Sequence, residues 1–325
     1  MVSLWSGNVM AQAAAPVAAP VDTPVAENIA PGVTRYGEVA YQSLSGYHPQ
    51  QADLYVPTAG AASYPAVVYV HGGGWGVGSS RMSGLSQTLT ALAARGYVVM
   101  AINYRFYGEA KFPAQIQDTK AAIRWLRSNA AAYKVDTNKI AIWGESAGGY
   151  LAALAGTSCN AAALEPPKPA GGAAMPGQTQ IKVDANQSSC VQAVVDYYGP
   201  TEFAAMDGQL TVANARKHNG TDSAESQLLG CALTQCAKSL LQQSNPLTYV
   251  DGNEPPFLIV HGDKDTAVPL GQSEMLAAAL KAKKVTVTFK TVSGADHMFN
   301  GASAAQKQDI TDTVYAFLDK TLKGR

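Results

Sequence analysis

The chain has 325 residues, of which 47% are hydrophobic and 15% are charged, and its formal net charge is zero. This much apolar material suffices for a folded core and argues against global disorder. The balanced charge shows neither the basic excess nor the basic stripe of a nucleic-acid-binding protein. No apolar run approaches the roughly 18 residues of a membrane-spanning helix, so we expect no membrane span.

Residues 1–31 differ in composition from the rest of the chain. They are rich in Ala, Val and Pro and contain no lysine or arginine. Ala11-Gln12-Ala13 matches the A-x-A pattern that precedes a signal-peptide cleavage site, which favours a secreted or periplasmic protein. A disordered Ala/Pro leader is the equal alternative. In either case we exclude residues 1–31 from the fold and expect a single domain over 32–325.

Strand and helix patterns alternate along this domain. Two antiparallel edge strands are predicted around residues 35–41 and 51–56. Apolar runs predict further strands at 65–71, 97–104, 140–143, 191–198, 256–261 and 285–292. Helical spacing and end signals predict helices at 82–95, 113–131, 149–155, 271–281 and 302–323. This alternation is typical of an α/β fold with a mostly parallel central sheet and helices on both faces.

Two segments interrupt the alternation. Residues 160–189 are rich in Pro and Gly and are interpreted as a long loop insertion. Residues 201–247 are mixed and partly helical, and we expect them to form a small cap over the functional site.

The stretch from Ile140 to Ala155 carries the strongest functional motif. An apolar strand is followed by Gly144-Glu145-Ser146-Ala147-Gly148, which fits G-x-S-x-G, and then by a helix. A strand that turns into a helix within two or three residues forces a strained elbow at the serine and leaves little room for a Cβ on either side. The pattern predicts that Ser146 is a nucleophile.

A serine hydroxyl needs a base, and histidine is the residue type that suits this role. His297 follows the last predicted strand, and loops at the carboxyl edge of a parallel sheet are where sites form. The other four histidines are better explained otherwise: His71 and His261 by loop geometry, His48 by an edge turn, and His218 as an exposed polar residue of the cap. The sequence therefore favours His297 as the base.

The group that orients the base is expected in the loop after the preceding strand. Two aspartates lie there, Asp263 and Asp265, and either would give the chain order Ser…Asp…His of α/β-hydrolases. We favour Asp265 because it lies deeper in the loop. Asp263 is interpreted as a turn residue that bonds nearby backbone amides.

Backbone donors for an oxyanion are predicted in the glycine run His71-Gly72-Gly73-Gly74. Without side chains, its amides can approach a substrate oxygen. We assign this role to Gly73 and Gly74, together with the amide of Ala147. Trp75 could instead supply an amide or an aromatic wall.

Other residues near the motifs receive more modest interpretations. Trp75, Tyr198 and Met298 are candidates for lining a substrate pocket, with plain packing as the alternative. Glu145 is expected to be a structural carboxylate bonded to nearby backbone. No Cys/His cluster has metal-ligand spacing, and no G-x-G-x-x-G follows a strand, so we expect neither a metal nor a cofactor. Arg105 and Asp118 are expected to form a structural ion pair.

Four cysteines in a chain with a possible secretion leader suggest disulfides. We favour Cys159–Cys190, which would close the Pro/Gly-rich insertion at its base, together with Cys231–Cys236. Two other pairings are possible, and four buried free thiols in a cytosolic enzyme are the alternative.

Several segments together resemble a known family: HGGGW, NYR, FPAQIQD, GESAGG, VVDYYGPT, PPFLIVHGDKD and GADHMF. They are similar to the α/β-hydrolase esterases called BD-FAE, which are close to hormone-sensitive-lipase-type carboxylesterases. The resemblance extends from about Val33 to the C-terminus and implies Ser146, Asp265 and His297 as the catalytic triad. The chain departs from the family in the 160–189 insertion and in its four cysteines. We expect these departures to lie where substrates are chosen.

The resemblance implies a serine esterase that hydrolyses feruloyl or acetyl esters of plant polysaccharide, or small acyl esters. Its partners would be a small ester or an acylated polysaccharide. A peptidase of the prolyl oligopeptidase type is a rival, but it would need a large propeller domain for which 325 residues leave no room. A non-catalytic small-molecule receptor on the same fold is a second rival, and such receptors typically lose the histidine.

Overall fold

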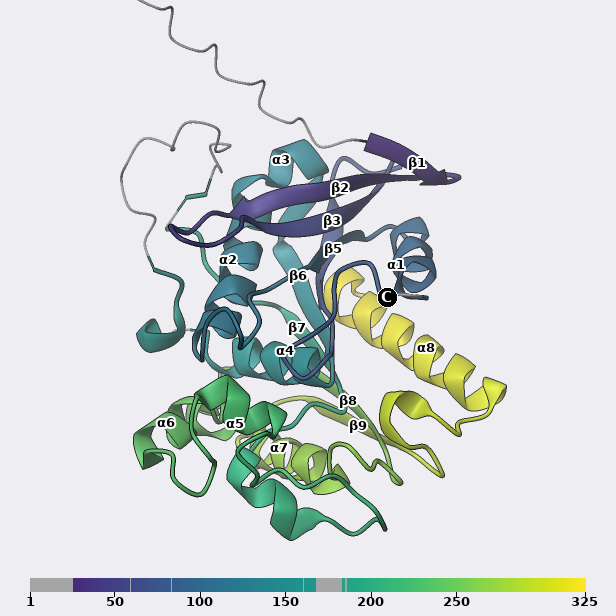
Figure 1. The fold of residues 1–325 in the computed structure, drawn as a ribbon. Coiled ribbons are helices and arrows are strands. Elements are labelled where there is room, and N and C mark those ends of the chain that lie inside the picture. Colours follow the sequence, from purple (N-terminus) through teal and green to yellow (C-terminus); the bar gives the residue numbers. More distant parts are fainter. Residues whose placement is uncertain (1–25, 59, 83, 160, 168–182, 185) are drawn as a thin grey trace, which may run out of the picture.

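The structure is a computed structural model that describes residues 26–58, 60–82, 84–159, 161–167, 183–184 and 186–325. A nine-stranded sheet with the order β1-β2-β3-β5-β4-β6-β7-β8-β9 forms its centre (Figure 1). The strands are β1 Ala26–Ala30, β2 Val33–Gln42, β3 Gln50–Pro57, β4 Tyr64–Val70, β5 Val98–Ile102, β6 Val135–Glu145, β7 Ala193–Tyr197, β8 Phe257–Gly262 and β9 Val287–Val292. The pairs from β1 to β5 are antiparallel, and those from β5 through β4 to β9 are parallel.

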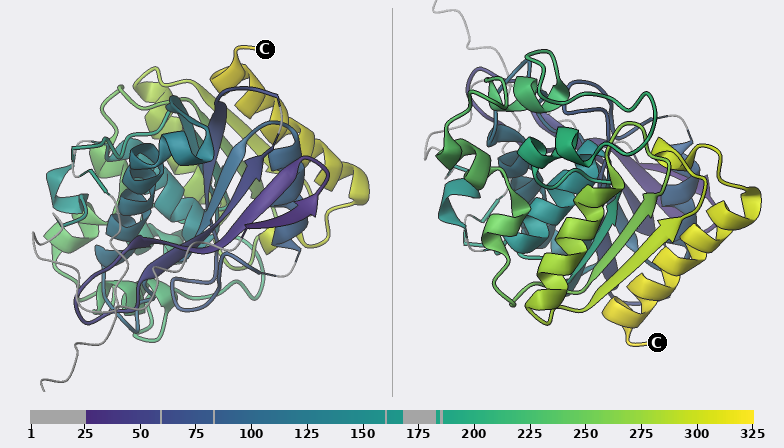
Figure 2. Two further views of the ribbon diagram at one scale, coloured as in Figure 1. Left: turned by 90° about the horizontal axis from the view of Figure 1, so that it is seen from above. Right: turned by 90° about the horizontal axis from the view of Figure 1, so that it is seen from below.

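Helices cover both faces of this sheet (Figure 2). The main ones are α1 Leu85–Ala94, α2 Ala114–Ser128, α3 Ala130–Tyr133, α4 Ala147–Thr157, α5 Ala224–Leu229, α6 Lys238–Gln243, α7 Leu270–Ala282 and α8 Ala304–Leu318. Helices α1 and α8 pack into one apolar cluster, while α2, α4 and α7 belong to the cluster on the other face. Short 3₁₀ turns lie at Ala162–Leu164, Phe203–Gln209, Pro246–Tyr249 and His297–Phe299, and a π-helical turn follows α8 at Asp319–Lys323.

The central parallel strands are mostly apolar where they cross the core, because both faces of the sheet are covered there. Every residue of β5 and β8 is buried, and so is every residue of α4. Alternate side chains of one strand enter different clusters: Val68 faces the α2 and α4 side, whereas Val67 faces the α1 and α8 side. Uninterrupted apolar runs in the sequence are therefore the correct signal for these strands.

Each strand and helix predicted for the domain is present, with small differences at the ends. The boundary of the leader at residue 31 is wrong, because Ala26–Ala30 forms β1 and pairs with β2. Pro31 and Gly32 make the two-residue turn between them, and Gly32 has a φ of 77°. Pro followed by Gly suits the central positions of such a turn, since Pro supplies a fixed negative φ and Gly a positive one. Strand β1, not β2, is the edge of the sheet. Residues 1–25, including the possible cleavage motif, lie outside the described residues.

Helix α1 begins three residues later than the predicted start at Met82. Gly84, with a φ of 79°, is its N-terminal cap residue and ends the preceding turn in a left-handed conformation. Gly96 follows the helix with a φ of 83°, as its predicted position after the C-terminus requires. The 201–247 segment contains only short helices, which agrees with its mixed pattern. None of the helices in the described residues is both long and apolar enough to cross a bilayer.

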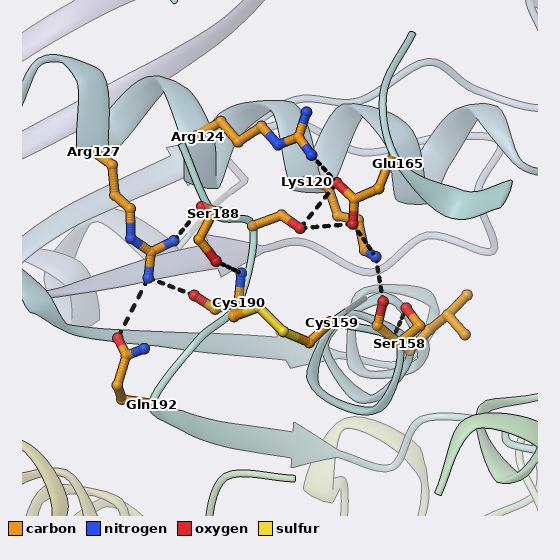
Figure 3. The surroundings of a disulfide bond; sticks show 11 residues. Lys120, Arg124, Arg127, Ser158, Cys159, Glu165, Ser188, Cys190 and Gln192 are labelled. Atoms are coloured by element: carbon orange, nitrogen blue, oxygen red, sulfur yellow. Dashed lines mark hydrogen bonds and ion pairs between the residues drawn. A yellow bond between two sulfur atoms is a disulfide. The ribbon is translucent and has the colours of Figure 1, made fainter. Parts of the chain in front are cut away.

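Both predicted disulfides are present, and the described residues contain no free cysteine. Cys159–Cys190 joins the segment after α4 to the segment before β7. Figure 3 shows that this bond lies beside a polar cluster centred on Glu165, whose carboxylate binds Lys120 at 2.8 Å and also Arg124, both from α2. The Lys120 side chain is fully buried, so its ammonium group needs the Glu165 carboxylate to stabilise its charge.

The described ends of the 160–189 insertion lie away from the cavity over Ser146. Helix α4 begins at the serine elbow and runs for 11 residues, or roughly 16 Å at 1.5 Å per residue, before it reaches Cys159. The described ends of the insertion are therefore anchored at the far end of α4 from Ser146. None of the described insertion residues lines the cavity at Ser146. The described part of this departure therefore does not lie at the cavity over Ser146, and residues 160, 168–182 and 185 lie outside the described residues.

Candidate functional site

Ser146 sits on the sharp turn between β6 and α4. Its backbone has φ 54° and ψ −120°, a strained conformation for a residue with a side chain. A Cβ on Gly144 would overlap the Gly148 carbonyl, and a Cβ on Gly148 would overlap the Val70 carbonyl. Glycine is thus required on both sides of the serine by close backbone packing, as the motif predicts.

The structure brings together the three side chains that the sequence singles out. His297 Nε2 lies 3.0 Å from Ser146 Oγ, and His297 Nδ1 lies 2.7 Å from Asp265 Oδ2. A carboxylate can only accept, so Nδ1 carries the proton and Nε2 is left free to accept one from the serine. The three groups form a continuous hydrogen-bond relay at the carboxyl edge of the parallel strands.

Asp265 is buried, and its carboxylate is held by several donors. Its Oδ1 accepts from the backbone amides of Ala267 and Val268, at 2.8 and 2.7 Å. Its Oδ2 also lies 3.2 Å from His261 Nε2. Burial alone would raise the pKa of this carboxyl, but the hydrogen bonds from His261 and His297 outweigh burial and hold its pKa well below the usual range. Asp265 therefore remains ionised beside the imidazole.

Two neighbours of the relay were missed by the sequence reasoning. His261 was attributed to loop geometry, yet it contacts Asp265, and its Nδ1 lies 2.7 Å from Ser273 Oγ. Asp296 accepts at Oδ1 from the amides of Thr266 and His297, both at 2.7 Å, and so ties the loop of the acid to the loop of the base. The spacing H-x-x-x-D and the acidic residue before His297 are the signals that could have found them.

The glycine loop after β4 has an unusual backbone. Gly73, Gly74 and Trp75 have successive φ values of 111°, 59° and 58°. The amides of Gly73 and Gly74 donate to no acceptor within the described chain. Trp75 is buried, and its Nε1 donates to the Ala147 carbonyl at 3.1 Å, which holds the loop against the start of α4. Burial lowers the pKa of His71 to about 4, so this imidazole is neutral, and its Nδ1 donates to the Gly72 carbonyl.

A cavity of about 670 Å³ opens over the relay. Its lining includes Ser146, His297, the glycine loop and, from the cap, residues 216–217 and 222–225. The three candidates for substrate contact, Trp75, Tyr198 and Met298, all lie on its wall. Met298 is 57% exposed and Val77, also on the wall, is 66% exposed, so the mouth of the cavity presents apolar surface.

Tyr198 contacts the relay directly, besides lining the cavity. Its ring lies edge-to-face with the His297 ring at a centroid distance of 4.7 Å. Its hydroxyl donates to Glu145 Oε2 at 3.1 Å, so Glu145 binds a tyrosine hydroxyl rather than the nearby backbone that we expected. The backbone of Tyr198 has a φ of 42°. This side chain packs against the histidine and is anchored beside the nucleophile.

The remaining expectations have mixed outcomes. Arg105 and Asp118 form the expected ion pair at 2.7 Å, and both are buried. Asp263 accepts from the Gly294 amide at 2.7 Å and has the structural role expected of it. His218 is 1% exposed, so its prediction as an exposed residue is wrong; it packs against Glu225 inside the cap. Over the described ranges, no group of three or more His, Cys, Asp or Glu residues is placed to hold a metal ion.

The chain is similar to several known proteins. Esterase LipC of Mycobacterium tuberculosis is 30% identical over 262 residues, which are 80% of this chain and 59% of LipC. The chain spans between half and two thirds of the length of the first curated relatives that it matches.

Two solved structures are also similar. One is described as a truncated form of a carbohydrate esterase from gut microbiota, with 29% identity, a TM-score of 0.71, and coverage of 89% of this chain and 96% of that one. The other is a bifunctional GH43-CE protein of Bacteroides eggerthii, with 35% identity, a TM-score of 0.67, and coverage of 86% and 38%. These similarities confirm the predicted α/β-hydrolase fold.

The model of the BD-FAE family matches residues 52–280, a range that includes Ser146 and Asp265 and ends before His297. The match covers more than half of the chain, and it includes the elbow, the glycine loop and the parallel strands β4 to β8. The chain therefore belongs to the BD-FAE family of α/β-hydrolases.

Proposed function

We propose that the chain is a carboxylic ester hydrolase that acts through Ser146, His297 and Asp265. The observation that carries this proposal is the relay of 3.0 and 2.7 Å contacts from Ser146 Oγ through the imidazole to a buried, ionised carboxylate. The names of the similar proteins, which are esterases, support the same reaction. A non-catalytic receptor would have no need of this relay.

The proposed reaction proceeds in two steps through an acyl-enzyme. His297 Nε2 takes the Ser146 proton as Oγ attacks the ester carbonyl, and it then gives that proton to the departing alcohol as the carbon–oxygen bond breaks. In the second step His297 takes a proton from water as the water oxygen attacks the acyl carbon, and it returns that proton to Ser146 Oγ as the acyl–oxygen bond breaks and the acid leaves. Asp265 keeps the imidazole in the required tautomer throughout.

The amides of Gly73, Gly74 and Ala147 are proposed to bind the oxyanion that forms in both steps. The two glycine amides have no acceptor in the described structure, and Ala147 is the first residue of α4, where helix amides lack an intrahelical partner. Preorganised donors of this kind are among the largest contributions to acyl-transfer catalysis. Trp75, Tyr198 and Met298 are proposed to line the substrate pocket.

The proposed substrates are acetyl or feruloyl esters of plant polysaccharide, or small acyl esters. The description of one structural neighbour as a carbohydrate esterase supports the first group. The apolar mouth formed with Val77 and Met298 suits an aromatic or short acyl chain. We further propose that the protein is secreted or periplasmic, since its two disulfides are compatible with an oxidising compartment.

The proposal is tested with Ser146→Ala on p-nitrophenyl esters of increasing chain length, methyl ferulate and acetylated xylan. Loss of the nucleophile should lower kcat on the order of a million-fold, because the triad acts as a unit. Ser63→Ala is the matched control, because Ser63 is exposed and lies far from Ser146 in the sequence. A fluorophosphonate probe should label the wild type and the control but not Ser146→Ala. Wild-type protein that neither turns over an ester nor reacts with the probe would refute the proposal and favour a receptor.

A further inference from the structure

The His297 ring is bound through both of its nitrogen atoms. Nδ1 lies 2.7 Å from Asp265 Oδ2, and Nε2 lies 3.0 Å from Ser146 Oγ. In an acyl-enzyme the serine oxygen is esterified and has no proton to donate, so the contact with Asp265 alone holds a ring nitrogen. A hydrogen bond at one atom leaves the ring free to tilt. The imidazole therefore needs a further contact if it is to keep one orientation through both steps of the proposed reaction.

Tyr198 supplies a contact of this kind. The centroid of its ring lies 4.7 Å from that of His297, and the two ring planes are inclined by 61°. The tyrosine ring also lies 6.4 Å from the ring of His261, so it borders both imidazoles that contact Asp265. Aromatic packing at these distances restricts the movement of the rings that take part in it.

Tyr198 is itself held from several sides. Its side chain is buried, its hydroxyl donates to Glu145 Oε2 at 3.1 Å, and its amide donates to the Val260 carbonyl at 2.9 Å. Glu145 directly precedes the nucleophile in the chain. The contacts thus form a closed circuit, which runs from the neighbour of Ser146 through Tyr198 to His297 and back to the Ser146 hydroxyl.

The backbone of Tyr198 is strained. Its φ of 42° lies in a region that a bulky side chain seldom adopts. The Gly199 amide donates to Asp196 Oδ1 at 2.9 Å and closes the turn that imposes this conformation. Strain of this kind costs folding free energy and is concentrated at active sites, and a glycine would adopt the same φ without the cost. A tyrosine at this point therefore calls for a role of its side chain.

We infer that Tyr198 is a positioning residue, whose ring holds the His297 imidazole in the orientation that both steps of the proposed reaction require. The inference rests on the proposed esterase function and is distinct from the lining of the pocket by Tyr198. A residue that only contacts the acyl chain affects each ester to a different extent. Misplacement of the base instead slows acylation and deacylation of every ester, so kcat falls and KM changes little.

The test compares kcat and KM of the wild type and Tyr198→Leu on p-nitrophenyl acetate, butyrate and hexanoate. Leucine removes the ring, and we expect kcat to fall on the order of a hundredfold by a similar factor for each ester, because small displacements of a reacting group have effects of this size. The rate of inactivation by a fluorophosphonate should fall in parallel. Tyr198→Phe keeps the ring and loses only the bond to Glu145, so it should retain more than about a tenth of the wild-type kcat.

Tyr249→Leu is the matched control. The Tyr249 hydroxyl is also anchored, at 2.8 Å from the Gln243 carbonyl, but this residue does not line the cavity over Ser146, so the variant should keep the wild-type kcat. If Tyr198→Leu does not fold, Tyr198→Asn is measured in its place, because asparagine adopts a positive φ more readily.

Several outcomes would overturn the inference and leave the esterase proposal intact. They are a change in KM alone, losses of kcat that differ from one ester to the next, an equal loss in Tyr198→Phe, and failure of both the leucine and the asparagine variants to fold. Wild-type protein that hydrolyses none of these esters and does not react with the fluorophosphonate would instead contradict the esterase proposal itself.

Discussion

Asp265 shows how one residue can be prepared for its role by its neighbours. Each carboxylate oxygen has a defined set of donors, the backbone amides at Oδ1 and two imidazoles at Oδ2. Burial opposes ionisation of this carboxyl, but the hydrogen bonds have the larger effect, so its pKa is lowered. His261 is fixed in turn by Ser273 and the Val268 carbonyl, so the donors themselves are preorganised.

The two aspartates of the same loop should therefore respond very differently to mutation. We expect Asp265→Asn to lower kcat about ten-thousand-fold, because an amide in place of the carboxylate favours the wrong tautomer of His297. Asp263→Asn should cost less than about tenfold, since Asp263 bonds only the Gly294 amide in the described structure. Steady-state kinetics with p-nitrophenyl acetate measure both, with circular dichroism as the check on folding. The reverse order of effects would mean that the acid is misassigned.

Single residues were predictable where a local motif fixes the backbone. The elbow at Ser146 needs glycine on both sides, and the G-x-S-x-G motif shows that requirement directly in the sequence. His218 was not predictable, because its burial depends on contacts with Asp207 and Glu225 that follow no periodic pattern. Tyr198 was predicted only as a pocket residue, since its contact with the His297 ring joins loop segments that are far apart in the sequence.

Most strands and helices could be predicted from regular hydrophobic patterns in the sequence. The parallel strands were found because they are buried on both faces and read as unbroken apolar runs. Strand β1 was missed because AENIA is short and exposed at the sheet edge, and the Pro31-Gly32 turn is its only clear signal. The described ends of the 160–189 insertion lie away from the cavity because they follow α4, whose length separates them from Ser146, and the sequence analysis did not take this separation into account.

The Cys159–Cys190 disulfide joins two of these elements, and its removal should be measurable. Chain-entropy estimates for a separation of 31 residues give about 3–4 kcal/mol of unfolding free energy, against roughly 2 kcal/mol for Cys231–Cys236. We expect the double variant Cys159→Ser/Cys190→Ser to lose more stability than Cys231→Ser/Cys236→Ser in urea titrations.

Esterase activity should survive in the first double variant under native conditions, because this bond lies at the far end of α4 from Ser146. The unreduced, denatured wild type should contain no titratable thiol. Finding four thiols in secreted protein would contradict the pairing, and equal losses in the two double variants would contradict the entropic account.

For the molecule as a whole, Asp196 should make stability depend on pH. It lies near the end of β7, wholly buried, and its Oδ2 has no partner in the described residues. Burial raises the pKa of this carboxyl to about 6, although a hydrogen bond from Gly199 opposes the rise. An unfolded aspartate has a pKa of about 3.9. Between these values the folded protein holds a proton that the unfolded chain has lost, so this residue lowers the free energy of unfolding as pH rises.

The reduction in the free energy of unfolding caused by Asp196 should reach about 3 kcal/mol above pH 6 and vanish below pH 4. Because an asparagine side chain does not titrate, the stability of Asp196→Asn relative to the wild type should improve by about this amount from pH 4 to pH 7. Urea titrations of both proteins across that range measure the difference, and Asp136→Asn, at a position on the sheet that is only partly buried, serves as the control. A difference that does not change with pH would mean that Asp196 does not titrate in the folded protein.

The bond between Cys159 and Cys190 also has a practical consequence. It closes the intervening chain into a covalent ring, one end of which follows α4 while the other precedes β7, and neither Cys159 nor Cys190 lines the cavity at Ser146. The entropic cost of closing a loop whose ends are fixed rises only with the logarithm of the loop length. A fluorescent domain, an affinity tag or a tether to a solid support could therefore be inserted in this ring at little cost in folding free energy.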